Sequence, residues 1–302
     1  MKMKILAIDT SGLQAGAAIV SFEGTSSYII GEIFLNARTG EKSYTHSEIL
    51  MPGVEQLFHL TRLEPKNIDY VAYTCGPGSF TGLRIGAACA LGIARSLNIP
   101  AIPVPTLDAL AYNALETGSE CIIVPMLDAR RGQVYTAMYI RGEDGKIERK
   151  TEFSALSVGE LFVVRTDEEG CPPHFKNLLA MSPDFCNHSM ACHDGVCCAR
   201  KIIFLGDGTD ANKNAILNAF PNAIFPFANN NRQRAASTAV WAAEKIREGC
   251  EFPKTPEILY VRAPQAVREK NEKLEKEKLR LERTITTLTR RLLEVEKELE
   301  IS

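Results

Sequence analysis

Apolar and polar positions follow one another in short blocks along the first third of the chain. Lys4–Asp9 is an apolar run that ends at an acid followed by small polar residues, which is typical of a buried strand and a turn. The same kind of pattern predicts strands at Ala15–Phe22, Gly31–Ala37, Ile68–Thr74 and Asn98–Val104, and helices at His46–Leu60, interrupted at Pro52-Gly53, and at Leu83–Leu97. Strands that cluster first and then alternate with a helix indicate an α/β domain.

A second series of such blocks begins at Thr106. It predicts helices at Leu107–Leu115, Ala211–Phe220 and Ala236–Glu248, and strands at Ile122–Leu127, Gln133–Arg141 and Lys201–Leu205. The chain has 302 residues, which is more than one small hydrophobic core can organise. We therefore expect two halves. They are assigned to residues 1–105 and 106–262, with a Cys/His-rich insertion at about 168–199 and with residues 236–262 as a candidate addition to the first half.

The pattern changes abruptly after Ala263-Pro264. Residues 265–302 contain no Gly or Pro, and residues 263–302 hold ten Lys or Arg and nine Asp or Glu. Seven apolar residues follow one another at spacings of seven, four, three, four, three and four: Leu274, Leu281, Ile285, Leu288, Leu292, Val295 and Leu299. Such a heptad seam predicts a coiled-coil-like amphipathic helix over 263–302, because a merely solvated charged helix would need no seam.

Charge and hydropathy exclude two classes of protein. The 35 Lys and Arg nearly balance the 37 Asp and Glu, whereas a stand-alone nucleic-acid binder usually carries a basic excess. The longest apolar stretch, Ile85–Ala94, is far shorter than the roughly 18 residues that a membrane span needs. The N-terminus also lacks the pattern of a secretory signal peptide. We therefore expect a cytoplasmic protein that makes no contact with a membrane.

The nine cysteines fall into two groups. Cys75, Cys89, Cys121 and Cys250 are scattered through predicted strands and helices and are expected to be ordinary reduced thiols. The insertion gathers eight candidate metal ligands: Cys171, His174, Cys186, His188, Cys192, His193, Cys197 and Cys198. Structural zinc needs four sulfur or nitrogen ligands, but no C-x2-C or H-x3-H pair is present. A variable insertion with free thiols is the favoured alternative to a zinc site.

Three short loops could contact a nucleotide. The loop that contains Gly76 and Gly78 connects a buried strand to a helix, and its backbone N–H groups would suit an anion, although such glycines also serve tight packing. It lacks the Lys of a P-loop. Asp9, Thr10 and Ser11 follow the first strand and resemble the first phosphate loop of actin-like ATPases. Gly206-Asp-Gly208 would be the matching loop of the second half.

Six motifs together resemble the TsaB family, non-catalytic dimerisation subunits of the bacterial machinery that makes threonylcarbamoyladenosine in tRNA. They are Ile5-Leu-Ala-Ile-Asp-Thr-Ser11, His46-Ser-Glu48, Gly76-Pro-Gly-Ser-Phe-Thr-Gly-Leu-Arg-Ile-Gly86, Asp128-Ala-Arg-Arg-Gly-Gln-Val-Tyr135, Gly206-Asp-Gly208 and Tyr260-Val-Arg-Ala-Pro-Gln265. The resemblance covers roughly residues 1–270 outside the insertion. It implies an α/β fold of two RNase H-like subdomains of the actin-like ATPase superfamily, to which the C-terminal coiled-coil-like helix is added.

The resemblance also implies which subunit this chain is. The catalytic paralogue, TsaD, binds a metal through a His-x-x-x-His pair on the helix after the return strand, where one helical turn puts both imidazoles on one face. Thr106 and Leu110 stand at those positions here, and His46 and His59 form no such pair. The chain would then hold no catalytic residue, metal or cofactor of its own and would serve as the scaffold that TsaD requires when it modifies the adenosine next to the anticodon.

The implied partners are TsaD and the ATPase subunit TsaE, with tRNA reached only through the complex. A nucleotide could bind at the interface with the paralogue, and the isolated chain could form a homodimer. Candidate contact residues lie on the Leu83–Leu97 helix: Arg84, Gly86, Ala90, Ile93 and Ala94. The small residues among them would admit a partner helix or, equally, close packing onto the chain's own sheet.

Two other classes of function stay open from the sequence. An autonomous actin-like ATPase or sugar kinase would need a catalytic Asp and a fuller second phosphate loop than Gly206-Asp-Gly208. A metalloprotease is disfavoured, because neither HExxH nor HxxxH occurs in the chain.

Overall fold

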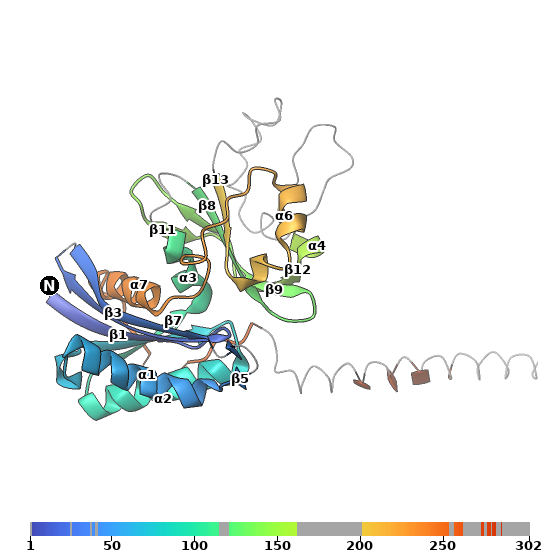
Figure 1. The fold of residues 1–302 in the computed structure, drawn as a ribbon. Helices are drawn as coiled ribbons and strands as arrows, with labels where there is room; N and C mark the ends of the chain where they lie inside the picture. The colour runs from blue at the N-terminus through green and yellow to red at the C-terminus, as the bar shows by residue number, and fades with distance from the viewer. Residues whose placement is uncertain are drawn as a thin grey trace, which may run out of the picture. The chain divides into compact units, whose positions relative to one another are not determined.

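The structure, a computed structural model, describes most of the chain up to residue 261 and a few positions beyond it. The described residues are 2–24, 26–36, 38–39, 42–114, 121–161, 201–253, 257–261, 273–274, 277–278, 280–281 and 285. The chain divides into two compact units, Met1–Val261 and Arg262–Ser302. The first unit contains two main β-sheets with helices packed against them (Figure 1).

The first sheet has the strand order β3-β2-β1-β6-β7. Its strands are β1 (Lys2–Asp9), β2 (Gln14–Glu23), β3 (Ser26–Asn36), β6 (Tyr70–Gly76) and β7 (Ala101–Pro105). The first three strands form an antiparallel meander, and β6 and β7 continue the sheet parallel to β1. Two short strands, β4 (Arg38–Thr39) and β5 (Lys42–Ser43), pair separately.

Helices cover both faces of this sheet (Figure 1). On one face pack α1 (His46–Thr61) and α2 (Phe80–Leu97), and on the other packs α7 (Ala235–Arg247). A 3-10 turn, η1 (Pro65–Asn67), precedes β6. The predicted interruption of α1 at Pro52-Gly53 is wrong. The helix continues through Pro52, whose ring is exposed, and Gly53 is buried against β3, where a Cβ would lie 3.1 Å from Leu35.

The second sheet has the strand order β11-β10-β8-β9-β12, with β13 beside β8. Its strands are β8 (Cys121–Asp128), β9 (Gln133–Thr136), β10 (Tyr139–Arg141), β11 (Ile147–Arg149), β12 (Ser154–Ser157) and β13 (Lys201–Leu205). The sequence predicted one strand over 133–141, but the structure has two. The first pairs with the end of β8 and with β12, whereas the second pairs with the start of β8 and with β11.

Short helices complete the second half. They are α3 (Thr106–Ala111), η2 (Tyr112–Ala114), α4 (Val158–Leu161), η5 (Asp207–Thr209) and α6 (Lys213–Ala219). The helices α3 and α7 lie between the two sheets in Figure 1. Ala109 of α3 belongs to the core under α7, while Leu107 and Leu110 belong to the core of the second sheet. One short helix therefore joins the two hydrophobic cores.

The two halves share one strand topology, and this shows which loop of the first half corresponds to which loop of the second. In each half an antiparallel hairpin, β1–β2 or β8–β9, is followed by a strand parallel to the first, β6 or β13. Asp9 and Asp128 both end the first strand, and Gly76 and Gly206 both lie at the end of the parallel strand. The expected match between the Asp9 loop and Gly206-Asp-Gly208 is therefore wrong: Gly206 corresponds to Gly76.

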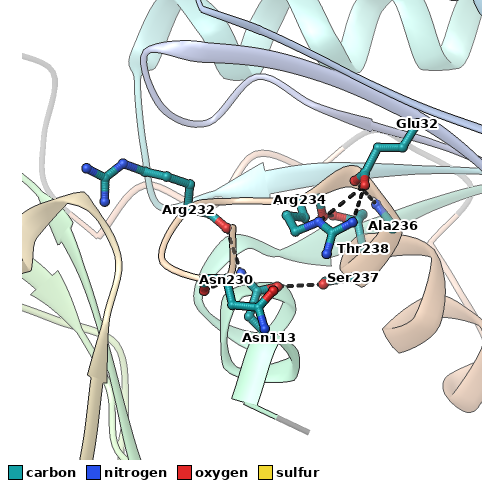
Figure 2. Close-up of polar contacts among 8 residues, drawn as sticks. All are labelled: Glu32, Asn113, Asn230, Arg232, Arg234, Ala236, Ser237 and Thr238. Atoms are coloured by element: carbon teal, nitrogen blue, oxygen red, sulfur yellow. Dashed lines mark hydrogen bonds and ion pairs between the residues drawn. The ribbon is translucent and has the colours of Figure 1, made fainter. Parts of the chain in front are cut away.

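Two sets of polar contacts hold the segment that leads into α7, one around Asn113 and one around Glu32 (Figure 2). We call them together the polar clamp. The amide of Asn113 donates to the carbonyl oxygens of Asn230 (3.1 Å) and Arg232 (2.6 Å), and its oxygen accepts from Ser237 Oγ at 2.6 Å. On β3, Glu32 forms an ion pair with Arg234 and accepts from the N–H of Ala236 at 3.1 Å. The clamp thus fixes the N-terminus of α7, which packs on the first sheet.

In the second unit, the described positions are helical. Leu274, Leu281 and Ile285 are each more than half exposed there. Within the described residues of both units, no helix is long and apolar enough to cross a membrane.

Replacing Asn113 with Ala removes three hydrogen bonds from a side chain that is only 7% exposed. We expect the free energy of unfolding to fall by about 2–4 kcal/mol, since two carbonyl groups and a hydroxyl lose a buried partner. Ser237→Ala removes only one of these bonds and should cost about 1 kcal/mol. Urea unfolding measures both variants, and equal losses would show that the clamp does not depend on Asn113.

Candidate functional site

Asp9 is the last residue of β1, where the turn to β2 begins, and is 4% exposed. Its Oδ1 accepts from the backbone N–H of Ser11 (2.9 Å), from Ser11 Oγ (2.6 Å) and from Thr74 Oγ1 (3.2 Å). Its Oδ2 has no hydrogen-bond partner among the described residues. Burial outweighs these hydrogen bonds and raises the pKa of the Asp9 carboxyl above its usual range.

Side chains close around the same turn. At Gly12, an added Cβ would lie 2.9 Å from Nε2 of Gln233, whose side chain is 5% exposed. The ring of His46, the first residue of α1, lies 3.1 Å from the carbonyl oxygen of Gly12 through Nε2. The first residue of α1 therefore contacts the β1–β2 turn.

The glycine-rich motif packs directly on this turn. Thr10 Oγ1 donates to the carbonyl oxygen of Gly82 at 2.8 Å, and the N–H of Ser79 donates to the carbonyl oxygen of Ser11 at 2.7 Å. A Cβ at Gly82 or at Gly86 would overlap Thr10, and a Cβ at Gly78 would overlap Ser11. Close contact of the glycine-rich motif with the β1–β2 turn therefore explains all three glycines.

The chain itself uses some of the N–H groups that a nucleotide phosphate would need at this loop. The N–H of Gly82 donates to Ser79 Oγ at 3.3 Å, and the N–H of Leu83 donates to the Ser79 carbonyl at 2.9 Å. With the N–H of Ser79 bonded to Ser11, three N–H donors around the start of α2 are bonded within the chain. Gly76, with φ of 119°, packs against the backbone of Leu259.

Close packing also accounts for the glycines at the second loop. Gly206 has φ of 105°, and a Cβ there would overlap the carbonyl oxygen of Met126. At Gly208, a Cβ would lie 3.0 Å from Val134 and from the Met126 backbone. Asp207 accepts from the N–H of Asp128 at 2.9 Å, and burial raises the pKa of the Asp207 carboxyl. Nucleotide binding by either loop stays a prediction.

The two positions that the resemblance places opposite the histidines of TsaD belong to the core. Thr106 is fully buried and Leu110 is 1% exposed. The Leu110 side chain packs on Gly206, 3.0 Å from the position of an added Cβ. Within residues 2–161 and 201–261, as far as the structure describes them, no group of three or more His, Cys, Asp or Glu could hold a metal ion. The Cys/His-rich insertion lies outside the described residues.

The predicted partner residues on α2 divide between its two faces. Gly86, Ala90 and Ala94 face the chain's own core, and Ala90 is fully buried. Their burial in the core under α2 favours close packing onto the chain's own sheet, the alternative that the sequence left open, and contact of these three with a partner stays a prediction. Arg84 is exposed and Ile93 is half-buried, so a contact through these two stays a prediction.

Sequence reasoning missed an aromatic cluster at the start of α2. The guanidinium of Arg84 lies 3.8 Å from the ring centroid of Phe80, and its Nε donates to the hydroxyl of Tyr260 at 3.0 Å. The ring centroids of Phe80 and Tyr260 lie 5.3 Å apart with the rings tilted by 36°, and the two residues are 37% and 41% exposed. The cluster anchors residues 257–261, whose Leu259 N–H donates to the Cys75 carbonyl at 2.7 Å. No local pattern joins residues so far apart in the chain.

The four scattered cysteines behave as predicted. Cys75, Cys89, Cys121 and Cys250 form no disulfide with any described residue. Burial raises the pKa of the Cys75 thiol to about 12, so this thiol stays protonated at neutral pH.

Comparison with known proteins identifies the family. The model of the family described as "TsaD: tRNA N6-adenosine threonylcarbamoyltransferase" matches residues 40–290. The chain belongs to this family. Its curated relatives are TsaB proteins of tRNA threonylcarbamoyladenosine biosynthesis, so within the family the chain is a TsaB-type member.

Two relatives show how far the likeness extends. TsaB of Bacillus subtilis (strain 168) is 39% identical over 137 residues, which are 45% of this chain and 55% of that protein. TsaB of Escherichia coli (strain K12) is 34% identical over 143 residues, 47% of this chain and 58% of that protein. The chain therefore spans about half the length of the curated relatives it matches.

A solved structure supports the TsaB-type fold. YeaZ from Pseudomonas aeruginosa has a TM-score of 0.59 at 20% identity, covering 85% of this chain and 99% of that chain. At this identity the likeness concerns the fold alone, and it confirms the mixed α/β fold that the sequence predicted.

Gly82→Ala should be strongly destabilising, because the new Cβ would overlap the backbone of Thr10. We expect a loss of about 3 kcal/mol or more in the free energy of unfolding. Gly92→Ala, an exposed position of the same helix with nothing within 4 Å of its Cβ site, should instead gain up to about 1 kcal/mol. Chemical denaturation compares the two, and similar effects would contradict the packing of α2 on Thr10.

Asp9→Asn tests the buried carboxyl through pH. Since burial raises the pKa of Asp9 in the folded state, the folded chain binds more protons than the unfolded chain, and stability falls as pH rises from about 4. The Asn variant lacks this titration while keeping an oxygen for Ser11. Its melting temperature should therefore exceed that of the unaltered chain at neutral pH, and the gap should close toward pH 4. A gap that widens on acidification would refute the raised pKa.

Proposed function

We propose that this chain is the non-catalytic subunit that a TsaD-type paralogue requires to transfer a threonylcarbamoyl group to the adenosine next to the anticodon of tRNA. The observation that carries the proposal is the closed β1–β2 turn of a TsaB-type chain. Asp9 and Thr10, which would face a nucleotide in an actin-like enzyme, are bonded to Ser11, Thr74 and Gly82 instead.

The chemistry would then belong to the partners. Buried Thr106 and Leu110 offer no imidazole for a metal, so the paralogue would supply the metal that stabilises charge during acyl transfer. We propose TsaE as the ATPase subunit of the same assembly, and contact with tRNA only through the complex. Any nucleotide would bind at the interface with the paralogue rather than to this chain alone.

The outer faces of α1 and α2 are the surface that we propose for the paralogue. On α2 this face combines exposed Ala88 and Gly92 with half-buried Ile85, Cys89 and Ile93. Small residues there would let a partner helix approach closely. On α1, Met51 and Leu60 are 42% and 67% exposed and add apolar area to the same proposed surface.

We also propose that residues 263–302 form a coiled-coil-like helix. Support comes from the heptad seam and from the helical conformation of the described positions between 273 and 285.

Gly92→Arg tests the proposed surface. An unpaired guanidinium in the middle of a desolvated helix contact should abolish co-elution with the paralogue and reduce tRNA modification by at least roughly a hundredfold. The fold should survive, because Gly92 is exposed with open space around it. Gly159→Arg is the matched control: Gly159 is another exposed helical glycine with open space, on α4 of the second half.

The assay is a reconstituted modification reaction with each component omitted in turn, beside gel filtration of each variant with the paralogue. Full activity of Gly92→Arg would show that the interface lies on another face of the chain. Modification of tRNA without this chain, or by this chain alone, would overturn the scaffold role itself.

A further inference from the structure

The start of α2 carries a guanidinium that is held in place without an anion. The Arg84 Cζ lies 3.8 Å from the centroid of the Phe80 ring, and Arg84 Nε donates to the hydroxyl of Tyr260 at 3.0 Å. We call these three residues the Arg84 cluster. Among the described residues, no hydrogen bond or ion pair engages the two Nη groups of Arg84. Because Nε is already bonded, the edge formed by the two Nη groups is the one left open to an oxyanion.

The fixed guanidinium distinguishes Arg84 from most arginines at a protein surface. An exposed ion pair is usually weak, because two long side chains lose conformational freedom when it forms. The Phe80 ring and the Tyr260 hydroxyl already order the Arg84 guanidinium before any partner arrives. Arg95 provides the contrast on the same helix: it is exposed, and its side chain makes no hydrogen bond, ion pair or ring contact with any described residue. A contact through Arg84 therefore costs less conformational entropy than one through Arg95.

The position of the Arg84 cluster indicates a protein as the molecule that it binds. Arg84, Ala88 and Gly92 follow one another at intervals of four residues and are all exposed, so they form one stripe along the outer face of α2. Phe80 and Tyr260 add two exposed rings at one end of this stripe. Tyr and Arg are enriched among the residues that dominate protein–protein binding, whereas 35 Lys and Arg against 37 Asp and Glu give no basic excess for RNA.

We infer that Arg84 binds a carboxylate of the paralogue, supplied by an Asp or Glu that lies beside the outer face of α2 in the complex. The two Nη groups match the two oxygens of a carboxylate in a bidentate pair. The rings of Phe80 and Tyr260 would shield that pair from water, which strengthens the attraction between the two charges. The inference rests on the surface proposed above for the paralogue and names the chemistry that this surface recognises.

Calorimetric titration of the full chain with the paralogue tests the inference. Arg84→Ala should weaken the affinity by at least roughly tenfold, and Arg84→Glu by more than roughly a hundredfold, because it brings two like charges together. Arg95→Ala is the matched control on the same helix and should change the affinity by less than about threefold. Equal losses at the two positions would overturn the inference, as would an unchanged affinity of Arg84→Ala.

The Arg84 cluster also anchors residues 257–261 to α2, so urea unfolding of each variant separates binding from folding. Tyr260→Phe keeps the ring but removes the acceptor for Arg84 Nε. It should leave the unfolding midpoint nearly unchanged and weaken the affinity by about threefold, since the guanidinium is then less ordered. Affinity that falls only in the variants that unfold more easily would overturn the inference, because the cluster would then serve the fold alone.

A charge exchange identifies the acid. Arg84→Glu is combined in turn with Arg at each Asp and Glu on the surface helices of the paralogue, and one such exchange should restore the affinity that Arg84→Glu loses. Failure of every exchange would overturn the inference. Unchanged affinity for the paralogue together with weaker tRNA binding by the complex would overturn it in favour of an RNA phosphate. Failure of the proposed function is a different result, namely tRNA modification that proceeds without this chain.

Discussion

The contact between Thr10 and the first turns of α2 is the constraint on which the rest of the first half depends. The Thr10 backbone and hydroxyl lie where Gly82 and Gly86 have no side chain, and any Cβ there would overlap them. The contact joins the β1–β2 turn to α2, the helix that follows β6. Because β1 pairs with both β2 and β6, these three strands and α2 are positioned together. Once this face of α2 is buried, only the opposite face is open to another molecule.

The same contact links packing to function. The turn that would face a nucleotide in an actin-like enzyme has Asp9 Oδ1 and Thr10 Oγ1 bonded within the chain, and Gln233 lies against Gly12. This arrangement buries the Asp9 carboxyl with one oxygen unpartnered among the described residues. Burial raises the pKa of that carboxyl. A turn closed in this way serves a scaffold better than it serves an enzyme, and it supports the role proposed for this TsaB-type chain.

Sequence pattern predicted the strands and long helices well, because apolar runs of strand length and helical periodicity are local properties. It could not decide what the small residues of α2 contact. Gly86, Ala90 and Ala94 recur every fourth residue and mark one helix face, but the repeat is the same whether a sheet or a partner helix covers it. The glycines at 76, 78, 206 and 208 posed the same ambiguity, since close packing and anion binding both require glycine. Pairings such as Arg84 with Tyr260 join residues that only the fold brings together.

Nucleotide binding by the isolated chain tests the central claim most directly. Titration calorimetry with ATP and Mg²⁺ on the full chain, with the same titration of Asp9→Ala as reference, measures whether the β1–β2 turn is closed. The account predicts no saturable binding at millimolar ATP and identical titrations for the two proteins. Saturable binding by the unaltered chain that Asp9→Ala abolishes would contradict it.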